Sequence, residues 1–554
     1  MRIRRFWVAT LTIAMFASAL TACSNKESTT PATTPATTVN DSTTAGNEAA
    51  ADQTTSGNGL VAAAVATSNA DPTSFFPLKN TGGGKNPLNE IYETLVDQDG
   101  PGGKIYGNLA KTWNMDGLDL YVEIYDNIYD SAGNHITADD VIYSYEYSWS
   151  QGYTTSKYLS YTDGIEKIDD YNIVFHWKED QLDTYSAIDS VLLGQFIFSQ
   201  ASYEASADGM ATTPVGTGPY VLKDFMPGSS AVLERRADYW QTDASLVGPQ
   251  HQANVQTITY KFISDPSQVV NALKSGDIDY ADTVDEASLA YFLSSGDWTV
   301  VRTYDRNLFC MFFNCLDGTI FHDMNLRAAL CYAINSDDIV AAVGGQDFAR
   351  RVYEYGVPGV TNYNENCESW ENYYTVTDLA LAKDYLAKSG YAGQTVQIHY
   401  YAGEFSTYCE AISLCIGAAC DQLGMKYEIH PTNAIEDVIS TVNGNWDIVV
   451  SNVGGDGNAV DYFRNNFNNG RYEGALINSF DEKIDELYNK TYTASGATPE
   501  NVSEFNQYLI DNYYVYGMME RITSAVMRSD LIADSSVTTR RSWTLPGSWV
   551  YYVD

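Results

Sequence analysis

The order of apolar and polar residues divides this chain into three stretches. Residues 6–20 form an apolar run behind a start that carries three arginines, and residues 24–59 hold almost no large apolar side chain. Residues 60–554 switch between the two-residue period of strands and the longer period of helices. The first run is shorter than the roughly 20 residues of a transmembrane helix, and no later stretch approaches that length without polar residues. The pattern predicts a secretory signal, a spacer and a folded part.

The first half of the folded part is rich in strand and hairpin patterns. Residues 89–96 (NEIYETLV) have a helical pattern. Thr137 is the expected N-cap of a helix that begins at Ala138, because acids follow in the first turn, where the helix dipole favours them. Residues 265–273 predict another helix, ended by Gly276. Strand patterns occur at 60–66, at 118–124, in 168–177 after a turn, and at 255–263.

Helices and strands alternate in the second half. Residues 325–335 (NLRAALCYAIN) form a strongly amphipathic helical pattern. Helical patterns follow at 378–386 and 408–423, and strand patterns at 396–401, 427–430 and 446–451. This alternation favours an α/β unit with a mainly parallel sheet. Because the folded part is too long for one simple core, we expect two or three subdomains.

The charge of the chain restricts its partners. The formal net charge is -39 at pH 7, and the signal stretch carries three arginines and no acids, so the remainder is more negative still. Such a surface repels nucleic acids and anionic lipid headgroups. It suits a cationic or zwitterionic ligand, although solubility alone accounts for it equally well.

The end of the apolar run adds a candidate modification. Leu20-Thr21-Ala22-Cys23 resembles a bacterial lipobox, whose cysteine is acylated and becomes the mature N-terminus. The resemblance implies a signal peptide over 1–22, and over 23–59 a lipidated Cys23 with a disordered tether. Acyl chains on Cys23 would hold the protein at the outer face of the cell membrane. The alternative is a cleavable signal with an incidental cysteine.

The chain carries no recognisable catalytic or metal-binding pattern. It has no Gly-x-Ser-x-Gly, His-Glu-x-x-His or Walker sequence, and its six histidines are scattered. The seven cysteines after Cys23 lie between residues 310 and 420 without a Cys-x-x-Cys pair. Because seven is odd, at least one thiol is free or pairs outside the chain. We expect no enzyme, no cofactor and no metal, although a hydrolase with paired carboxylates stays an alternative.

Seven segments, in one order, resemble the extracellular solute-binding proteins of ABC importers, in the peptide/nickel-type class. The most specific is 135–147 (HITADDVIYSYEY). In 214–221 (PVGTGPYV), Gly216 and Gly218 are expected to permit a tight turn with unusual φ values. The other segments are 89–96 with 107–113 (GNLAKTW), 235–240 (RRADYW), 269–279 (VVNALKSGDID) and 325–335.

The resemblance implies a fold, a mechanism and partners. The fold is a two-lobed, periplasmic-binding-protein-like (type II) α/β fold with an extra subdomain inserted in lobe I. Lobe I takes 60–85, 200–303 and 505–554, the extra subdomain 86–199, and lobe II 304–504. The implied protein is a monomer that captures peptides between its lobes and delivers them to permease subunits with separate ATPases. An oligosaccharide or a nickel complex is the alternative ligand.

The resemblance also points to ligand-binding residues in 446–457 (WDIVVSNVGGDG). Asp456 falls where peptide-binding members place the aspartate that holds the ligand's α-ammonium, although the aromatic residue and the Asp-Pro that usually follow are absent. The backbone of Asn452, Val453, Gly454 and Gly455 is expected to pair with an extended ligand. Phe309, on the strand that enters lobe II, would line the pocket. The alternative reading makes Asp456-Gly457 a simple turn and Phe309 a core residue.

Overall fold

The computed structural model describes most of the chain after residue 58. The expected signal peptide, Cys23 and the tether up to residue 58 lie outside the described residues. Residues 55–554 form one compact unit. The described residues are 59–65, 73–78, 86–98, 105–151, 161–181, 187–248, 251, 253–263, 265–281, 284, 286–403, 405–433, 445–455, 457–464, 466–467, 481–532 and 551–552.

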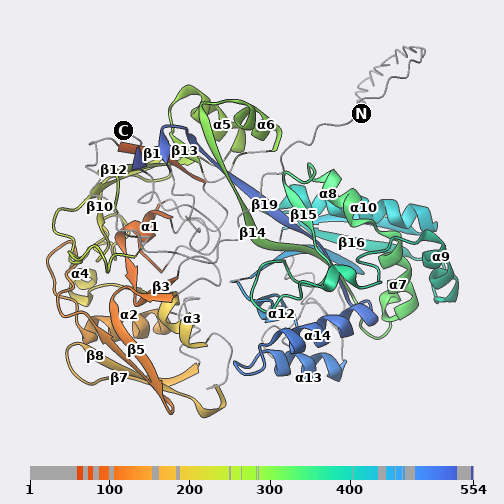
Figure 1. Ribbon diagram of the computed structural model, residues 1–554, viewed down its shortest axis with the longest axis horizontal. Coiled ribbons are helices and arrows are strands. Elements are labelled where there is room, and N and C mark those ends of the chain that lie inside the picture. The colour runs from red at the N-terminus through yellow and green to blue at the C-terminus, as the bar shows by residue number, and fades with distance from the viewer. Residues whose placement is uncertain are drawn as a thin grey trace, which may run out of the picture. The chain divides into compact units, whose positions relative to one another are not determined.

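One large sheet runs through the described part of the chain and has 11 strands (Figure 1). Across the sheet these are β10 (Tyr220–Met226), β11 (Ser230–Arg235), β12 (Thr257–Ile263), β1 (Gly59–Val65), β13 (Tyr280–Ala281), β19 (Val515–Arg528), β14 (Trp298–Phe313), β18 (Ile448–Gly454), β16 (Thr395–Tyr401) and β17 (Lys426–Thr432), while β15 (Ala349–Arg351) pairs with β19 outside this path. The strands expected at the start of the folded part and at 255–263 are confirmed as β1 and β12.

Two long antiparallel strands, β14 and β19, connect the two halves of this sheet, and Figure 1 shows them side by side. Leu308 to Phe313 of β14 and Val515 to Met519 of β19 belong to one large core cluster. The other ends of the same strands pack elsewhere, because Val526 and Met527 join two separate clusters. The chain therefore passes from one core to another twice, once along each strand.

The large cluster between Leu308 and Met519 is covered by helices. Because Phe505 and Leu509 belong to it, the lobe boundary expected at residue 505 would divide this core. The helices here are α7 (Met324–Ala333), α8 (Ser336–Ala342), α9 (Leu379–Lys388), α10 (Ser406–Leu423), α12 (Val460–Arg464), α13 (Glu482–Thr491) and α14 (Pro499–Asp511).

The α/β alternation expected in the second half is confirmed. β16 pairs in parallel with both β17 and β18, and its side chains alternate between buried and half-buried positions. The expected helices are α7, α9 and α10, and α10 ends at Gly424, whose φ of 70° is the left-handed cap that glycine adopts most easily. All seven cysteines between 310 and 420 are free, and only Cys415 is not fully buried.

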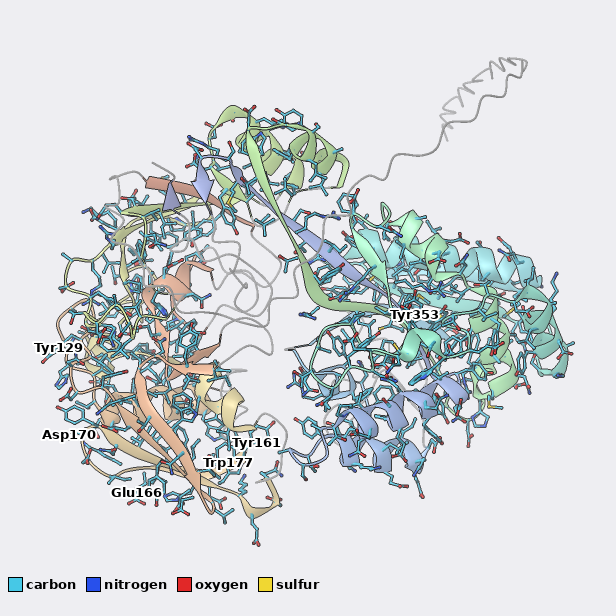
Figure 2. All side chains as sticks on the ribbon, in the orientation of Figure 1. Tyr129, Tyr161, Glu166, Asp170, Trp177 and Tyr353 are labelled. Atoms are coloured by element: carbon cyan, nitrogen blue, oxygen red, sulfur yellow. The ribbon has the colours of Figure 1, made fainter. Side chains whose placement is uncertain are left out.

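A separate four-stranded sheet lies in residues 110–177. Its antiparallel strands, in order, are β5 (Ala110–Asp116), β6 (Asp119–Ile124), β8 (Asn172–Trp177) and β7 (Thr162–Lys167). α2 (Ala138–Ser150) begins where expected, and the Thr137 N–H donates to the Asp140 carboxylate (3.0 Å). The rings of Tyr161 and Trp177 stack with centroids 6.5 Å apart (Figure 2). This sheet has a core cluster of its own.

The helix expected over 89–96 is wrong beyond its first turn. α1 (Asn86–Ile91) ends early, and β2 (Glu93–Thr94) pairs with β9 (Phe196–Ile197). The buried Glu93 carboxylate accepts hydrogen bonds from Tyr239 (2.7 Å) and Trp240 (2.8 Å). These long-range contacts, which no local pattern reveals, outweigh the helical periodicity.

The two glycines in 214–221 serve close packing and not unusual φ values, which corrects the expectation. Neither has a positive φ. A Cβ at Gly216 would lie 2.2 Å from the Ile91 carbonyl oxygen, and one at Gly218 would lie 2.6 Å from that of Glu90. The segment therefore needs glycine because its backbone lies directly against the end of α1.

The remaining elements are short strands and the helices of the first half. The strands are β3 (Val96–Gln98) paired with β4 (Ile105–Gly107), and β20 (Leu531–Ile532) paired with β21 (Tyr551–Tyr552). The helices are α3 (Ala187–Gly194), α4 (Gln200–Ala205), α5 (Pro266–Ser275) and α6 (Glu286–Ser294). α5 confirms the helix expected there, with Asp265 as its N-cap and Gly276 (φ 78°) as its C-cap.

Candidate functional site

The ladder between β14 and β19 is interrupted at Arg306. Tyr304 is paired with Ile522 and Leu308 with Glu520, so three residues of β14 lie opposite one residue of β19. Arg306, in the middle of this bulge, has a φ of 60°, which non-glycine residues seldom adopt. Bulges and strained backbone of this kind are concentrated at functional sites, where the surrounding structure holds them in place.

The bulge surrounds a buried carboxylate, Glu520, which has no exposed surface. Arg350 on β15 donates to it from Nε (2.6 Å), and the Arg306 backbone N–H donates to its other oxygen (3.3 Å). The Arg350 guanidinium also stacks on Tyr304, 3.6 Å from the ring centroid. Burial raises the pKa of Glu520 to about 7, although the charges of Arg350 and Arg306 act to lower it.

A second ion pair lies next to the first. Arg521 donates to the buried Asp305 carboxylate from Nε (2.5 Å), and the Asn307 side-chain amide donates to the same oxygen atom (3.1 Å). The Arg521 guanidinium lies over the rings of Phe405 (4.5 Å) and Tyr408 (5.7 Å). We call Asp305, Arg306, Arg350, Glu520 and Arg521 the bulge cluster.

Part of the site expected on β18 lies against this cluster. Asn307 is paired with Gly454 and Phe309 with Asn452. The half-buried Asn452 donates from its amide to the Asn307 side-chain oxygen (2.8 Å). Hydrogen bonds therefore connect Asn452, through Asn307, to Asp305 of the bulge cluster.

Gly455 also contacts the bulge, through a tyrosine. A Cβ at Gly455 would lie 2.7 Å from the Tyr462 ring, so only glycine leaves room for this ring. The Tyr462 hydroxyl donates to the Arg306 carbonyl oxygen (2.9 Å). The backbone of Arg306 is therefore fixed at its N–H by Glu520 and at its carbonyl by Tyr462.

The other residues expected at the site are placed as follows. Asp456 lies outside the described residues, and the carbonyl of the next residue, Gly457, accepts a hydrogen bond from the Thr361 N–H (2.8 Å). Val453 is buried. Phe309 is fully buried in the core cluster, with its ring near Phe405 (5.8 Å) and Tyr408 (5.2 Å). A contact between any of these residues and ligand stays a prediction.

The bulge cluster was not expected from the sequence. A signal was present, because Asp305-Arg306 interrupts a run of strand-forming residues that continues as LFCMFF. Such an interruption indicates either a strand end or a bulge, and the local sequence does not distinguish the two. The partners Arg350 and Glu520 are far away in the sequence. The pairing of β19 with β14 brings Glu520 to the bulge, and the pairing of β15 with β19 brings Arg350.

The chemistry of this region suits binding. Among the described residues, no group of three or more His, Cys, Asp or Glu side chains is arranged to hold a metal ion. The carboxylates of the bulge cluster accept hydrogen bonds from arginines and backbone, an arrangement that holds charge in place. Tyr353, labelled in Figure 2, lies two residues beyond β15 and stacks with Arg351 at 5.2 Å.

The family of this chain follows from its similarity to known proteins. The sequence profile of the bacterial extracellular solute-binding proteins, family 5 (Middle), matches residues 104–474. The chain belongs to this family. Members are extracellular, and the described part of this solute-binding protein contains no helix with the length and apolarity needed to span a membrane.

Individual relatives have low sequence identity to this chain. The oligopeptide-binding protein AppA of Bacillus subtilis is 26% identical over 234 residues, which cover 41% of this chain and 41% of AppA. The chain thus spans about two fifths of the length of the curated relatives it matches. The solved structure of AppA with a nonapeptide has a TM-score of 0.68 at 16% identity and covers 91% of this chain and 100% of that one.

Two further structures support the same fold. The ABC transporter substrate-binding protein CtaP of Listeria monocytogenes has a TM-score of 0.75 at 18% identity, covering 90% of this chain and 100% of that one. NikA of Staphylococcus aureus, solved with Ni(L-His)2, has a TM-score of 0.67 at 18% identity, with coverage of 90% and 100%. The solute-binding protein therefore has the expected type II periplasmic-binding-protein α/β fold.

Proposed function

We propose that this protein is the peptide-capturing component of an ABC importer. The observation that carries the proposal is the family match over residues 104–474. It is supported by the similarity to AppA, which is named for oligopeptide binding and was solved with a nonapeptide. Peptide is enclosed between two lobes, and the closed form docks on permease subunits driven by separate ATPases. The chain itself hydrolyses nothing.

The proposed lobes meet where β14 and β19 pass between core clusters. Lobe I comprises 60–85, 200–303 and the end of the chain, with the extra subdomain at 86–199, and lobe II begins at residue 304. Because the core that contains Leu308 also contains Met519, we assign lobe II a larger part of the C-terminal segment than the sequence alone suggested. Closure would turn about the two connecting strands.

The proposed ligand contacts lie at the end of β18. Asp456 accepts the α-ammonium of the peptide, and the backbone of residues 452–455 pairs with its extended chain. The described geometry supports this placement, since Asn452 and Gly455 contact the bulge cluster through Asn307 and Tyr462. Buried carboxylates beside a strand end are suited to a charged ligand group in a closed site.

A lipid on Cys23 is proposed to hold the protein at the outer face of the cell membrane, with residues 24–59 as a flexible tether. Mass spectrometry of the protein purified from its host membranes would show acyl chains on an N-terminal cysteine. A mature N-terminus downstream of Cys23 would remove this part of the proposal and leave the binding function standing.

The ligand is tested by native mass spectrometry of residues 55–554 purified from the host. A ladder of intact short peptides is expected. A nickel complex is the second candidate, because NikA shares the fold and was solved with Ni(L-His)2. A single metal complex or a sugar in the spectrum would keep the importer family and discard peptide. Cleaved products of an added peptide would contradict the binding role itself.

A further inference from the structure

Two arginines in the bulge cluster share one acceptor. The Arg306 guanidinium donates from Nη1 to the Pro358 carbonyl oxygen (3.1 Å), and Arg350 donates from Nη2 to the same oxygen (2.7 Å). Two positive groups that converge on one oxygen repel each other unless an anion lies nearby. Glu520 lies against both arginines, and both of its oxygens already accept hydrogen bonds, from Arg350 and from the Arg306 N–H.

The remaining carboxylates do not neutralise Arg306. Asp305 is paired with Arg521, so the bulge cluster holds three guanidinium groups against two carboxylates. Glu354, three residues beyond β15, is fully buried, and burial raises its pKa to about 8, which keeps it uncharged at pH 7. Among the described residues, the Arg306 side chain makes one hydrogen bond, to Pro358, and no ion pair.

The Arg306 side chain is partly exposed to solvent, and its backbone is held in position. Its side chain is half-buried, unlike the carboxylates beside it. Its backbone is fixed on both sides, since Glu520 accepts from its N–H and Tyr462 donates to its carbonyl. Because the β14–β18 ladder ends at the pair Asn307–Gly454, Arg306 and Gly455 are the next residues beyond its end. A receptor group fixed in advance loses little freedom on binding.

We propose that Arg306 receives a carboxylate of the bound ligand, with Arg350 and the Pro358 carbonyl as its positioning groups. The inference rests on the proposed peptide-binding function and adds the charge of the ligand that this protein prefers. The carboxylate can be the free C-terminus of a peptide or an acidic side chain, and both offer the two oxygens that a guanidinium binds best. The excess positive charge of the bulge cluster, within a strongly acidic protein, would favour ligands that carry a carboxylate.

The test compares two tetrapeptide libraries, one with free C-terminal carboxylates and one amidated, by titration calorimetry on the full mature protein. The amidated library is divided into members with and without Asp or Glu. We expect wild type to bind a carboxylate-bearing set about tenfold or more tightly than the amidated set without acids. Preference for the free acids identifies the C-terminus, and preference for acidic amides identifies a side chain.

Variants assign the preference to Arg306. Arg306→Gln should bind acid and amide libraries equally, and Arg306→Lys should retain part of the preference. Arg306→Gly keeps the backbone conformation without strain and should lose the preference with an unchanged or higher melting temperature, which separates binding from folding. Arg302→Gln is the matched control, since Arg302 lies on the same strand but pairs with Asp347.

The outcomes separate the two proposals. If wild type binds free-acid and amidated libraries equally, or if Arg306→Gln keeps the wild-type preference, the carboxylate inference is overturned while peptide capture stands. If wild type binds neither library, peptide capture fails and the inference fails with it. Loss of preference in Arg302→Gln as well would show a general effect of charge and would also overturn the assignment to Arg306.

Discussion

Glu520 and Arg350 form an ion pair in which the carboxylate has no exposed surface and the guanidinium is about one quarter exposed (27%). Arg350→Met removes the partner and leaves a buried carboxylate, which costs about 3–5 kcal/mol in comparable pairs. Because the pKa of Glu520 is already raised to about 7, the variant can take up a proton and recover part of this loss. Urea unfolding should therefore show a larger destabilisation at pH 8 than at pH 6.

The control for this prediction is Arg302→Met. Arg302 pairs with Asp347, whose side chain is 62% exposed, and exposed pairs contribute about 1 kcal/mol or less. An equal loss of stability in both variants, or a loss in Arg350→Met that does not change with pH, would contradict the assignment of Glu520 as a buried, titrating partner.

Glu354 predicts how stability depends on pH. Its carboxyl is fully buried, its Oε2 has no hydrogen-bond partner among the described residues, and burial raises its pKa from an ordinary 4.5 to about 8. The unfolded chain releases this proton near pH 4.5, whereas the folded protein keeps it until about pH 8. The contribution of Glu354 to stability is therefore fully present below pH 4.5 and is lost as the pH rises to 8, at about 1.4 kcal/mol per unit of pKa difference.

Glu354→Gln should remove this dependence, because glutamine has the same shape and does not titrate. Chemical unfolding between pH 5 and 8 should give a flatter profile than wild type, with the variant relatively more stable at pH 8. Glu371→Gln, at an exposed position of the same segment, is the matched control and should follow wild type. A variant profile parallel to that of wild type would show that Glu354 is already ionised in the folded protein.

Gly455→Ala should affect both folding and binding. The added Cβ would lie 2.7 Å from the Tyr462 ring, and crowding of this kind costs about 1–3 kcal/mol. Displacement of Tyr462 would also break its hydrogen bond to the Arg306 carbonyl. Gly296→Ala is the control, because no atom of the residues that the structure describes lies within 4 Å of its added Cβ. Equal melting temperatures and ligand affinities in the two variants would show that Tyr462 moves without cost.

Asp456→Ala tests the proposed ammonium site. If Asp456 holds the α-ammonium of a peptide, its removal should weaken binding about tenfold to a hundredfold, the range for hydrogen bonds to charged groups. N-acetylated peptides, which lack this charge, should bind wild type and variant equally weakly. An unchanged affinity for free peptides would make Asp456-Gly457 a simple turn and would leave the ammonium to another residue.

Much of the second half could be predicted, because its signals are local. The helix that ends at Gly424 has an uninterrupted apolar face and a glycine at the left-handed cap, and β16 alternates along its whole length. The secondary structure of the first half was harder to predict, because the Glu93 carboxylate accepts hydrogen bonds from Tyr239 and Trp240, which are distant in the sequence. No spacing within residues 89–96 contains that information.

The candidate site likewise has one part that could be predicted from the sequence and one part that could not. Asn452 and Gly455 were expected from their resemblance to a family segment, and the structure adds what they contact. The bulge cluster depends on the pairing of three strands, β14, β15 and β19, which are separated by long stretches of sequence. A charged Asp305-Arg306 within an apolar strand was its only visible sign, and Glu520 gave none.

The position of β19 sets the order in which the main sheet can be completed. β19 is a central strand between β13 and β14, yet it comprises residues Val515–Arg528, close to the end of the chain. A ribosome has made the other ten strands of this sheet before β19 exists, and contacts of such long sequence separation form slowly. An unfinished chain therefore has an open gap in the middle of its sheet. The two halves of the main sheet can therefore be joined only after β19 has been synthesised, although the separate four-stranded sheet does not depend on it.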